Sequence, residues 1–232
     1  MFYCDPLYFI VAIPGLLLAL AASAVTKFTF TKYSKVAASS GMTGAEAARA
    51  VLRAEGVTDV TIEQTQGFLS DHYDPSSNTL RLSPDVYHSN SLSAIGVACH
   101  EAGHALQKAH QYGPLAMRSN LVPVTQIGSH LAPLILMVGF FMQSPFLVQA
   151  GIILFSGVVI FTLVTLPVEW NASARAKELM VQARVVTMRE QPQAAAVLNA
   201  AFMTYVAAAV SAVLTLLYFL MRAGLLGNRR DD

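Results

Sequence analysis

Residues 92–110 read LSAIGVACHEAGHALQKAH, a run without proline that predicts a long helix. His100 and His104 are four residues apart, so their imidazoles lie one turn apart on one helix face and can reach a single ion. Glu101 between them is positioned to take a proton from a water molecule held by that ion. Such an HExxH pattern arises by chance in roughly half a per cent of chains with this composition. We therefore predict a zinc site with Glu101 as its catalytic base. The alternative is a helix in which the two histidines have no common function. That interpretation does not explain why Glu101 and Gly103 stand in an otherwise apolar helix.

A catalytic zinc ion needs a third protein ligand and one open position. His110 stands at the interval that metzincins use for that ligand, but Gln107 replaces the glycine of the metzincin pattern. The helix also continues through Lys108, so no turn brings His110 back toward the histidine pair. We interpret His110 as a polar residue at the end of the helix.

Glu169 is the best candidate for the third ligand. It ends an apolar run of more than twenty residues without a charge, follows Pro167, and opens a predicted helix through residues 171–177. A carboxylate at such a place is costly unless it is paired or bound to a metal. An ion pair with Arg175 at the membrane interface is the alternative, and the sequence leaves it open.

The composition indicates a membrane protein. Of the 232 residues, 54% are hydrophobic and 12% are charged, and the mean hydropathy is +0.50. The charged share is about half that of a soluble globular chain, so a freely soluble enzyme or a disordered chain fits poorly. A net charge of +1 without a basic cluster argues against a nucleic-acid partner. Four apolar windows are long enough to span a bilayer: residues 6–25, 121–142, about 146–168 and about 200–221.

The basic residues predict the orientation of the chain in the membrane. They are concentrated after the first window and between the third and fourth, whereas the hairpin turn at 143–145 carries no charge. By the positive-inside rule both long connections are cytoplasmic and the N-terminus is outside. Arg222, Arg229 and Arg230 after the last window, only partly offset by Asp231 and Asp232, count against this orientation. A site that faces outward and cuts envelope proteins therefore stays open.

The residues between the first two windows predict a small α+β domain. A capping box at 43–46 starts a helix, residues 60–63 and 79–82 alternate as half-buried strands do, and Ser91 or Ser93 caps the helix with the histidine pair. We predict a mostly α membrane protein with about four transmembrane helices and a small inserted α+β zincin-like domain. The predicted segments are an N-terminal transmembrane anchor at 1–26, the zincin-like domain at 27–120, a transmembrane helical hairpin at 121–168, a helix carrying the third ligand at 169–199, and a C-terminal transmembrane helix and tail at 200–232.

Three further features have two interpretations each. Tyr73 can donate to the tetrahedral intermediate or can simply pack a turn. Arg175 can bind a substrate carboxylate or the oxyanion, or can fill a lipid-headgroup or structural role. Gln126, Ser129 and His130 form a polar stripe in the second window. An intramembrane histidine is a candidate functional residue, although a hydrogen bond between helices also accounts for it.

Four motifs resemble those of the YugP-type neutral zinc metallopeptidases: HEAGHALQ at 100–107, DHYDP at 71–75, TLRLS at 79–83 and PVEWNAS at 167–173. The resemblance covers nearly the whole chain. It implies a bacterial multi-pass membrane protein, distantly similar to the HtpX and Ste24 peptidases, and it implies no particular substrate. It also implies His100, His104 and Glu169 as zinc ligands and Glu101 as the base. The HtpX and Ste24 group carries an aspartate four residues after the ligand glutamate, where this chain has Ser173.

These observations together predict a membrane-embedded zinc endopeptidase of the gluzincin type that hydrolyses membrane or membrane-proximal proteins. We expect the peptide to bind by strand addition to an edge of the α+β domain. The expected partners are a protein or peptide substrate and the lipid bilayer, with Zn²⁺ as the cofactor and no nucleic acid. The expected location is the bacterial cell membrane, with the active site on the cytoplasmic face. The oligomeric state is not predicted.

The alternative function is a non-catalytic metal-binding membrane protein, either a scaffold or a transporter. A transporter places its ligands at mid-membrane on broken helices. His100 and His104 lie outside the four windows, which counts against a transporter.

Overall fold

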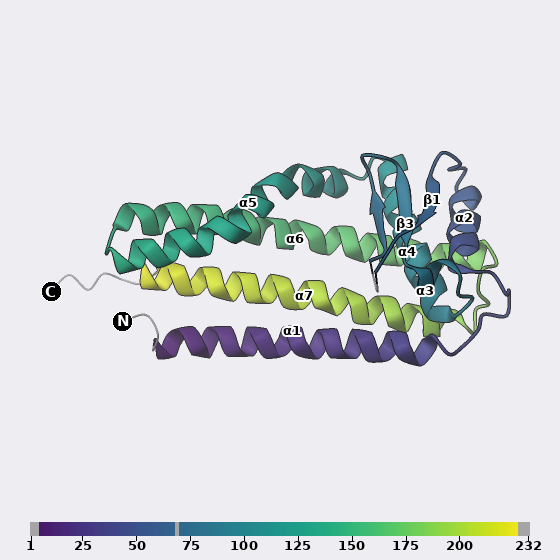
Figure 1. Ribbon diagram of the computed structural model, residues 1–232, viewed down its shortest axis with the longest axis horizontal. Helices are drawn as coiled ribbons and strands as arrows, with labels where there is room; N and C mark the ends of the chain where they lie inside the picture. Colours follow the sequence, from purple (N-terminus) through teal and green to yellow (C-terminus); the bar gives the residue numbers. More distant parts are fainter. Residues whose placement is uncertain (1–4, 68–69, 227–232) are drawn as a thin grey trace. The chain divides into compact units, whose positions relative to one another are not determined.

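The computed structural model describes residues 5–67 and 70–226 (Figure 1). Its helices are α1 (Pro6–Tyr33), α2 (Gly44–Ala54), α3 (Pro84–Tyr87), α4 (Leu92–Ala109), α5 (Gly113–Phe141), α6 (Pro145–Gln182) and α7 (Gln191–Arg222). Its strands are β1 (Thr61–Gln64), β2 (His72–Asp74) and β3 (Thr79–Leu82). The chain divides into two compact units. The helical unit comprises Met1–Ala21, Met117–Leu166 and Tyr205–Asp232, and the α+β unit comprises Ala22–Ala116 and Pro167–Thr204.

Four helices, α1, α5, α6 and α7, are long and apolar enough to cross a membrane, as predicted. The prediction of a separate helix after Pro167 is wrong, because α6 continues without a break from Pro145 to Gln182. A proline inside a helix removes only the hydrogen bond of its own missing N–H and adds a local clash, which membrane helices tolerate. Glu169 therefore lies on the same helix as the third predicted span.

The α+β unit contains a three-stranded sheet with the order β1-β3-β2. β1 pairs in parallel with β3, and β2 pairs antiparallel with β3 and forms one edge. The predicted strands at 60–63 and 79–82 correspond to β1 and β3. The motif at 71–75 forms β2 itself, and three residues are too few to show a period-two pattern before the turn begins.

Helix α4 lies at the centre of the α+β unit. The capping box of α2 is present, and Ser91 caps α4 by accepting a hydrogen bond from the Ala94 backbone N–H at 3.2 Å. α4 packs against α2 and against β2 and β3, and its sides are buried almost all round. The shared core also includes Met180 of α6 and Val197 of α7. Such packing holds the histidine-bearing helix rigidly.

In the helical unit, α5 and α6 form the predicted hairpin and approach closely at two glycines. A Cβ at Gly139 would lie 2.8 Å from the Val148 nitrogen, and one at Gly151 would lie 2.6 Å from the Leu136 side chain. Small residues allow membrane helices to pack this closely.

Candidate metal centre

Two histidines and one glutamate come together inside the α+β unit. The Nε2 atom of His100 lies 3.2 Å from Oε2 of Glu169, and Nε2 of His104 lies 3.6 Å from the same oxygen. One ligand atom from each residue can be chosen so that all three lie within 4.8 Å of one another. Glu169 is only 1% exposed. Two imidazole nitrogens with one carboxylate oxygen are a ligand set that zinc accepts.

Arg175 and His110, the two residues that entered the alternatives for the third ligand, contact each other. Arg175 does not take the glutamate but donates from Nε to the Asn171 side chain at 2.9 Å and from Nη1 to Nδ1 of His110 at 2.8 Å. His110 is the C-cap residue of α4, as predicted. The third group beside the histidine pair is therefore Glu169 and not His110.

Gly103 allows α6 to lie close enough to α4 for Glu169 to contact the two histidines. A Cβ at residue 103 would lie 2.6 Å from the carbonyl oxygen of Ala172 and 3.2 Å from its Cα. Both of these are backbone atoms, which cannot rotate away as the end of a side chain can. The glycine inside the HExxH motif thus permits the close approach of α6 in the segment that carries Glu169.

We expect Gly103→Ala to weaken zinc binding and to cost about 1–3 kcal/mol of folding stability through overpacking. The measurements are the zinc dissociation constant, by chelator competition, and the thermal midpoint of the metal-free protein in detergent. Gly113→Ala is the matched control, because a Cβ there meets nothing within 4 Å. Unchanged zinc affinity in Gly103→Ala would mean that the close approach is not needed for the site.

Gln107 orients His104 through a chain of hydrogen bonds with one consistent assignment. Its Nε2 donates to the carbonyl oxygen of Val168 at 2.7 Å and to Oδ1 of Asn171 at 3.0 Å. A carbonyl only accepts, and Oδ1 of Asn171 also accepts from Arg175, which only donates. The amide oxygen of Gln107 is therefore the atom 3.0 Å from Nδ1 of His104. Nδ1 must donate, which leaves the Nε2 lone pair for a metal.

No orienting role was predicted for Gln107, which was noted only because it stands where the metzincin pattern has a glycine. Its position three residues after His104, on the same helix face, is the signal that could have assigned it. Ser173 occupies the corresponding place for the other histidine, with its Oγ 3.1 Å from Nδ1 of His100. Ser173 is thus beside His100, at the position four residues after Glu169.

We expect Gln107→Leu to weaken zinc binding by about 10–100-fold, the usual cost of losing a group that orients a ligand. The leucine has similar length but cannot fix the His104 tautomer. Gln182→Leu is the control, because Gln182 lies exposed on α6 and its side chain donates a hydrogen bond to Glu178, away from the histidines. Equal zinc affinity in the two variants would contradict the orienting role.

Glu101 lies on α4 beside the cluster and is 9% exposed. Burial raises the pKa of Asp71, and the nearby charge of Glu101 raises it further, against two opposing hydrogen bonds from Ser83. Asp71 immediately precedes β2. The start of the edge strand is therefore close enough to Glu101 for their charges to interact.

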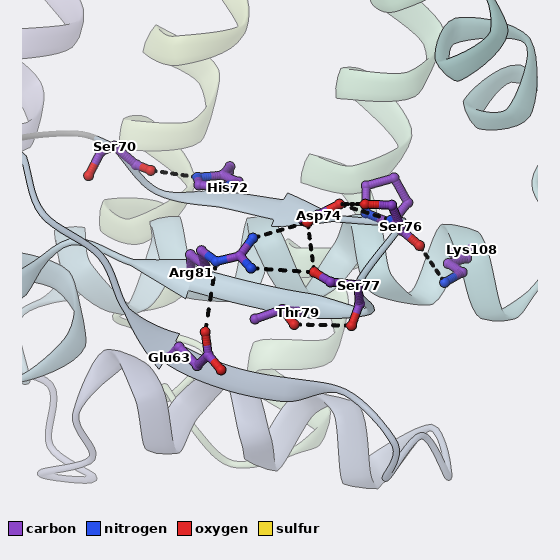
Figure 2. A network of polar contacts seen from close by, with 10 residues as sticks. Glu63, Ser70, His72, Asp74, Ser76, Ser77, Thr79, Arg81 and Lys108 are labelled. Atoms are coloured by element: carbon purple, nitrogen blue, oxygen red, sulfur yellow. Dashed lines mark hydrogen bonds and ion pairs between the residues drawn. The ribbon is translucent and has the colours of Figure 1, made fainter.

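Figure 2 shows the polar network that holds β2 and the turn after it. Arg81 of β3 donates to Asp74 at 3.1 Å and lies 3.8 Å from Glu63 of β1, and Lys108 of α4 donates to the Pro75 carbonyl. Hydrogen bonds from Ser76, Ser77 and Arg81 hold the pKa of Asp74 well below its usual range. This network ties the sheet to the end of the histidine-bearing helix.

Tyr73 and Arg175 lie outside the three-residue cluster. The Tyr73 hydroxyl donates to Asn78 in the turn between β2 and β3, and burial raises its pKa to about 12. Arg175 donates to Asn171, which also accepts a hydrogen bond from Gln107, the partner of His104. The turn-packing interpretation of Tyr73 thus agrees with its contacts.

The sequence matches known proteins over nearly its full length. A family model described as "Putative neutral zinc metallopeptidase" matches residues 8–224. The protein named "Putative membrane protease YugP" from Bacillus subtilis (strain 168) is 46% identical over 226 residues, which is 97% of this chain and 99% of the relative. No solved structure matches.

Proposed function

Because the chain belongs to the neutral zinc metallopeptidase family, we propose that it is a membrane-embedded endopeptidase that cleaves membrane or membrane-proximal proteins. In this proposal His100, His104 and Glu169 bind the zinc ion that the family uses, and Glu101 is the catalytic base. The observation that carries the proposal is the meeting of both Nε2 atoms with one buried carboxylate oxygen.

The hydrogen bonds behind the two histidines support their assignment as ligands. Gln107 and Ser173 engage the Nδ1 atoms, so both Nε2 atoms face Glu169. The chemistry that zinc supplies in such a site is Lewis acidity toward a peptide carbonyl and toward water.

Glu101 performs the proton transfers of the proposed reaction. It accepts a proton from water as the water oxygen attacks the scissile carbonyl carbon. The carboxylic acid then returns that proton to the nitrogen of the leaving amine as the C–N bond breaks. Glu101 follows His100 directly on α4 and is 9% exposed, which supports this role because the residue adjoins a proposed ligand and is not wholly buried.

Strand β2 is the proposed binding edge for the peptide. It has β3 on one side only, and it packs against the helix that carries the histidines. A peptide that pairs with the other side of β2 gains backbone hydrogen bonds that do not depend on its sequence. Asp71, at the start of this strand, interacts electrostatically with Glu101, which supports placing the scissile bond near the base.

We propose a multi-pass arrangement in which the α+β unit faces the cytoplasm. The basic residues of the two long connections support this orientation. Arg222, which counted against it, forms an ion pair with Asp5 at 3.1 Å within the helical unit. Arg229 and Arg230, which also counted against it, lie outside the described residues.

The experiment that tests the function compares protein N-termini in membranes from cells that express the wild type or Glu101→Gln at equal levels. We expect a set of new N-termini, in membrane or membrane-proximal proteins, that appears only with the wild type. Identical sets in the two membranes would contradict a proteolytic function. Reporter fusions after Lys35 separate a cytoplasmic site from one that faces outward.

A further inference from the structure

A chain of polar side chains leads from Arg175 to the proposed ligand His104. Arg175 donates from Nε to Oδ1 of Asn171 at 2.9 Å. Nε2 of Gln107 donates to the same oxygen at 3.0 Å. The amide oxygen of Gln107 in turn accepts a hydrogen bond from Nδ1 of His104 at 3.0 Å. Two side chains, those of Asn171 and Gln107, therefore connect the guanidinium to the imidazole.

The orientation of the Asn171 amide depends on Arg175. An asparagine amide has an oxygen on one side and an NH₂ group on the other, and a half-turn exchanges them. A guanidinium only donates, so Arg175 requires the oxygen on its side. With the amide turned round, its NH₂ group would face the N–H groups of both Arg175 and Gln107. Arg175 thus favours the orientation in which Asn171 accepts from Gln107.

The Gln107 amide is held by the acceptors that face its nitrogen. One is the Val168 carbonyl oxygen at 2.7 Å, and the other is Oδ1 of Asn171. Gln107 is fully buried, so solvent does not readily replace a lost acceptor, and a buried N–H group without a partner is costly. Loss of the Asn171 oxygen is therefore expected to loosen the amide that fixes the His104 tautomer.

Helix spacing and His110 hold the guanidinium in place. Asn171 and Arg175 are four residues apart on α6, the spacing that puts two side chains next to each other on a helix. Nη1 of Arg175 lies 2.8 Å from Nδ1 of His110, and this nitrogen must accept because arginine only donates. The hydrogen of the neutral ring is then on Nε2, which lies 3.9 Å from Oε2 of Glu55. The guanidinium is thereby tied to the C-terminal ends of α4 and α2.

We propose that Asn171 and Arg175 are positioning residues of the metal site. They act through Gln107 and hold the tautomer of His104 in which Nε2 is free for zinc. This inference rests on the proposed function, because it takes His104 as a ligand. It gives Arg175 a role other than binding a substrate carboxylate or the oxyanion. A residue that acts only on substrate leaves zinc binding unchanged when no substrate is present, so the two roles give different results.

The first test measures the zinc dissociation constant by chelator competition in detergent, without substrate. We expect Asn171→Leu and Arg175→Met each to weaken zinc binding about threefold to tenfold, the effect of one net hydrogen bond. Asn171→Asp keeps an oxygen acceptor for both donors and should bind zinc as the wild type does. Arg189→Met is the matched control, because Arg189 is exposed in the connection between α6 and α7.

The second test is a double-mutant cycle, which shows whether Arg175 acts through Gln107. Gln107→Leu already breaks the chain of hydrogen bonds. Arg175→Met should therefore cause no further loss of zinc affinity in the Gln107→Leu background. A general effect of Arg175 on the stability of the unit would instead add to the effect of Gln107→Leu, and the thermal midpoint of the metal-free variants measures it separately.

Two results would overturn the proposal. Zinc affinity of Arg175→Met equal to that of Arg189→Met would favour a role for Arg175 in substrate binding. Equal losses from Arg175→Met in the wild-type and Gln107→Leu backgrounds would show that Arg175 does not act through Gln107. In both cases the wild type still binds zinc, so the proposed function stands. A wild type that binds no zinc would contradict the proposed function as well.

Discussion

Replacing Glu101 by glutamine is expected to lower the cleavage rate by about 10²–10⁴-fold, the usual contribution of a general base, while fold and zinc content stay unchanged. The amide has the size and shape of the carboxylate but cannot accept the proton of the attacking water. Glu101 is not one of the three clustered residues, so its substitution should spare the metal. The measurements are kcat on a substrate identified from membrane N-termini and zinc per chain by elemental analysis.

Glu178→Gln is the matched control for this prediction, because Glu178 is exposed on α6 and accepts a hydrogen bond from Gln182. We expect wild-type rates from it. Activity of Glu101→Gln within tenfold of the wild type would remove Glu101 from the role of base, even if the protein proves to be a protease.

The second large effect is expected at Glu169. Glu169→Ala should weaken zinc binding by well over the roughly 10–100-fold that follows from losing an outer partner, because a direct ligand is removed. Glu169→Ala can also affect the fold of the metal-free protein, because it removes the carboxylate that both imidazoles contact. Glu169→Gln keeps the shape of the side chain and removes the charge, so it should fold and still bind zinc poorly. Zinc affinity by chelator competition and helicity by circular dichroism give the two readouts.

Glu178→Ala serves as the control on the same helix and should leave zinc affinity unchanged. If His110→Ala strips the metal and Glu169→Ala spares it, the ligand set is closer to that of metzincins. The contacts of His110 with Arg175 and of Glu169 with both histidines lead us to expect the opposite.

Local patterns were sufficient to predict much of the fold. The capping box at Thr43 and the cap at Ser91 depend on residues within one turn of each other, and each of the four long apolar helices is a continuous stretch of sequence. The pairing of His100 with His104 is equally local, because helix geometry alone puts them on one face.

Features that depend on tertiary contacts could not be read in this way. A proline within an apolar helix allows either a kink or an end, and only packing decides that α6 continues through Pro167. The sequence also left open whether Glu169 pairs with Arg175 or joins the histidines, which are more than sixty positions away. Gly103 and Gln107 gain their significance only from the backbone and carbonyls of α6 that lie against them.

X-ray absorption at the zinc edge of the purified, zinc-loaded protein tests the proposed site most directly. We predict a first shell of nitrogen and oxygen at about 2.0–2.1 Å with two imidazoles, unchanged in His110→Ala. A third imidazole that disappears in His110→Ala, or a sulfur neighbour at about 2.3 Å, would contradict binding by His100, His104 and Glu169.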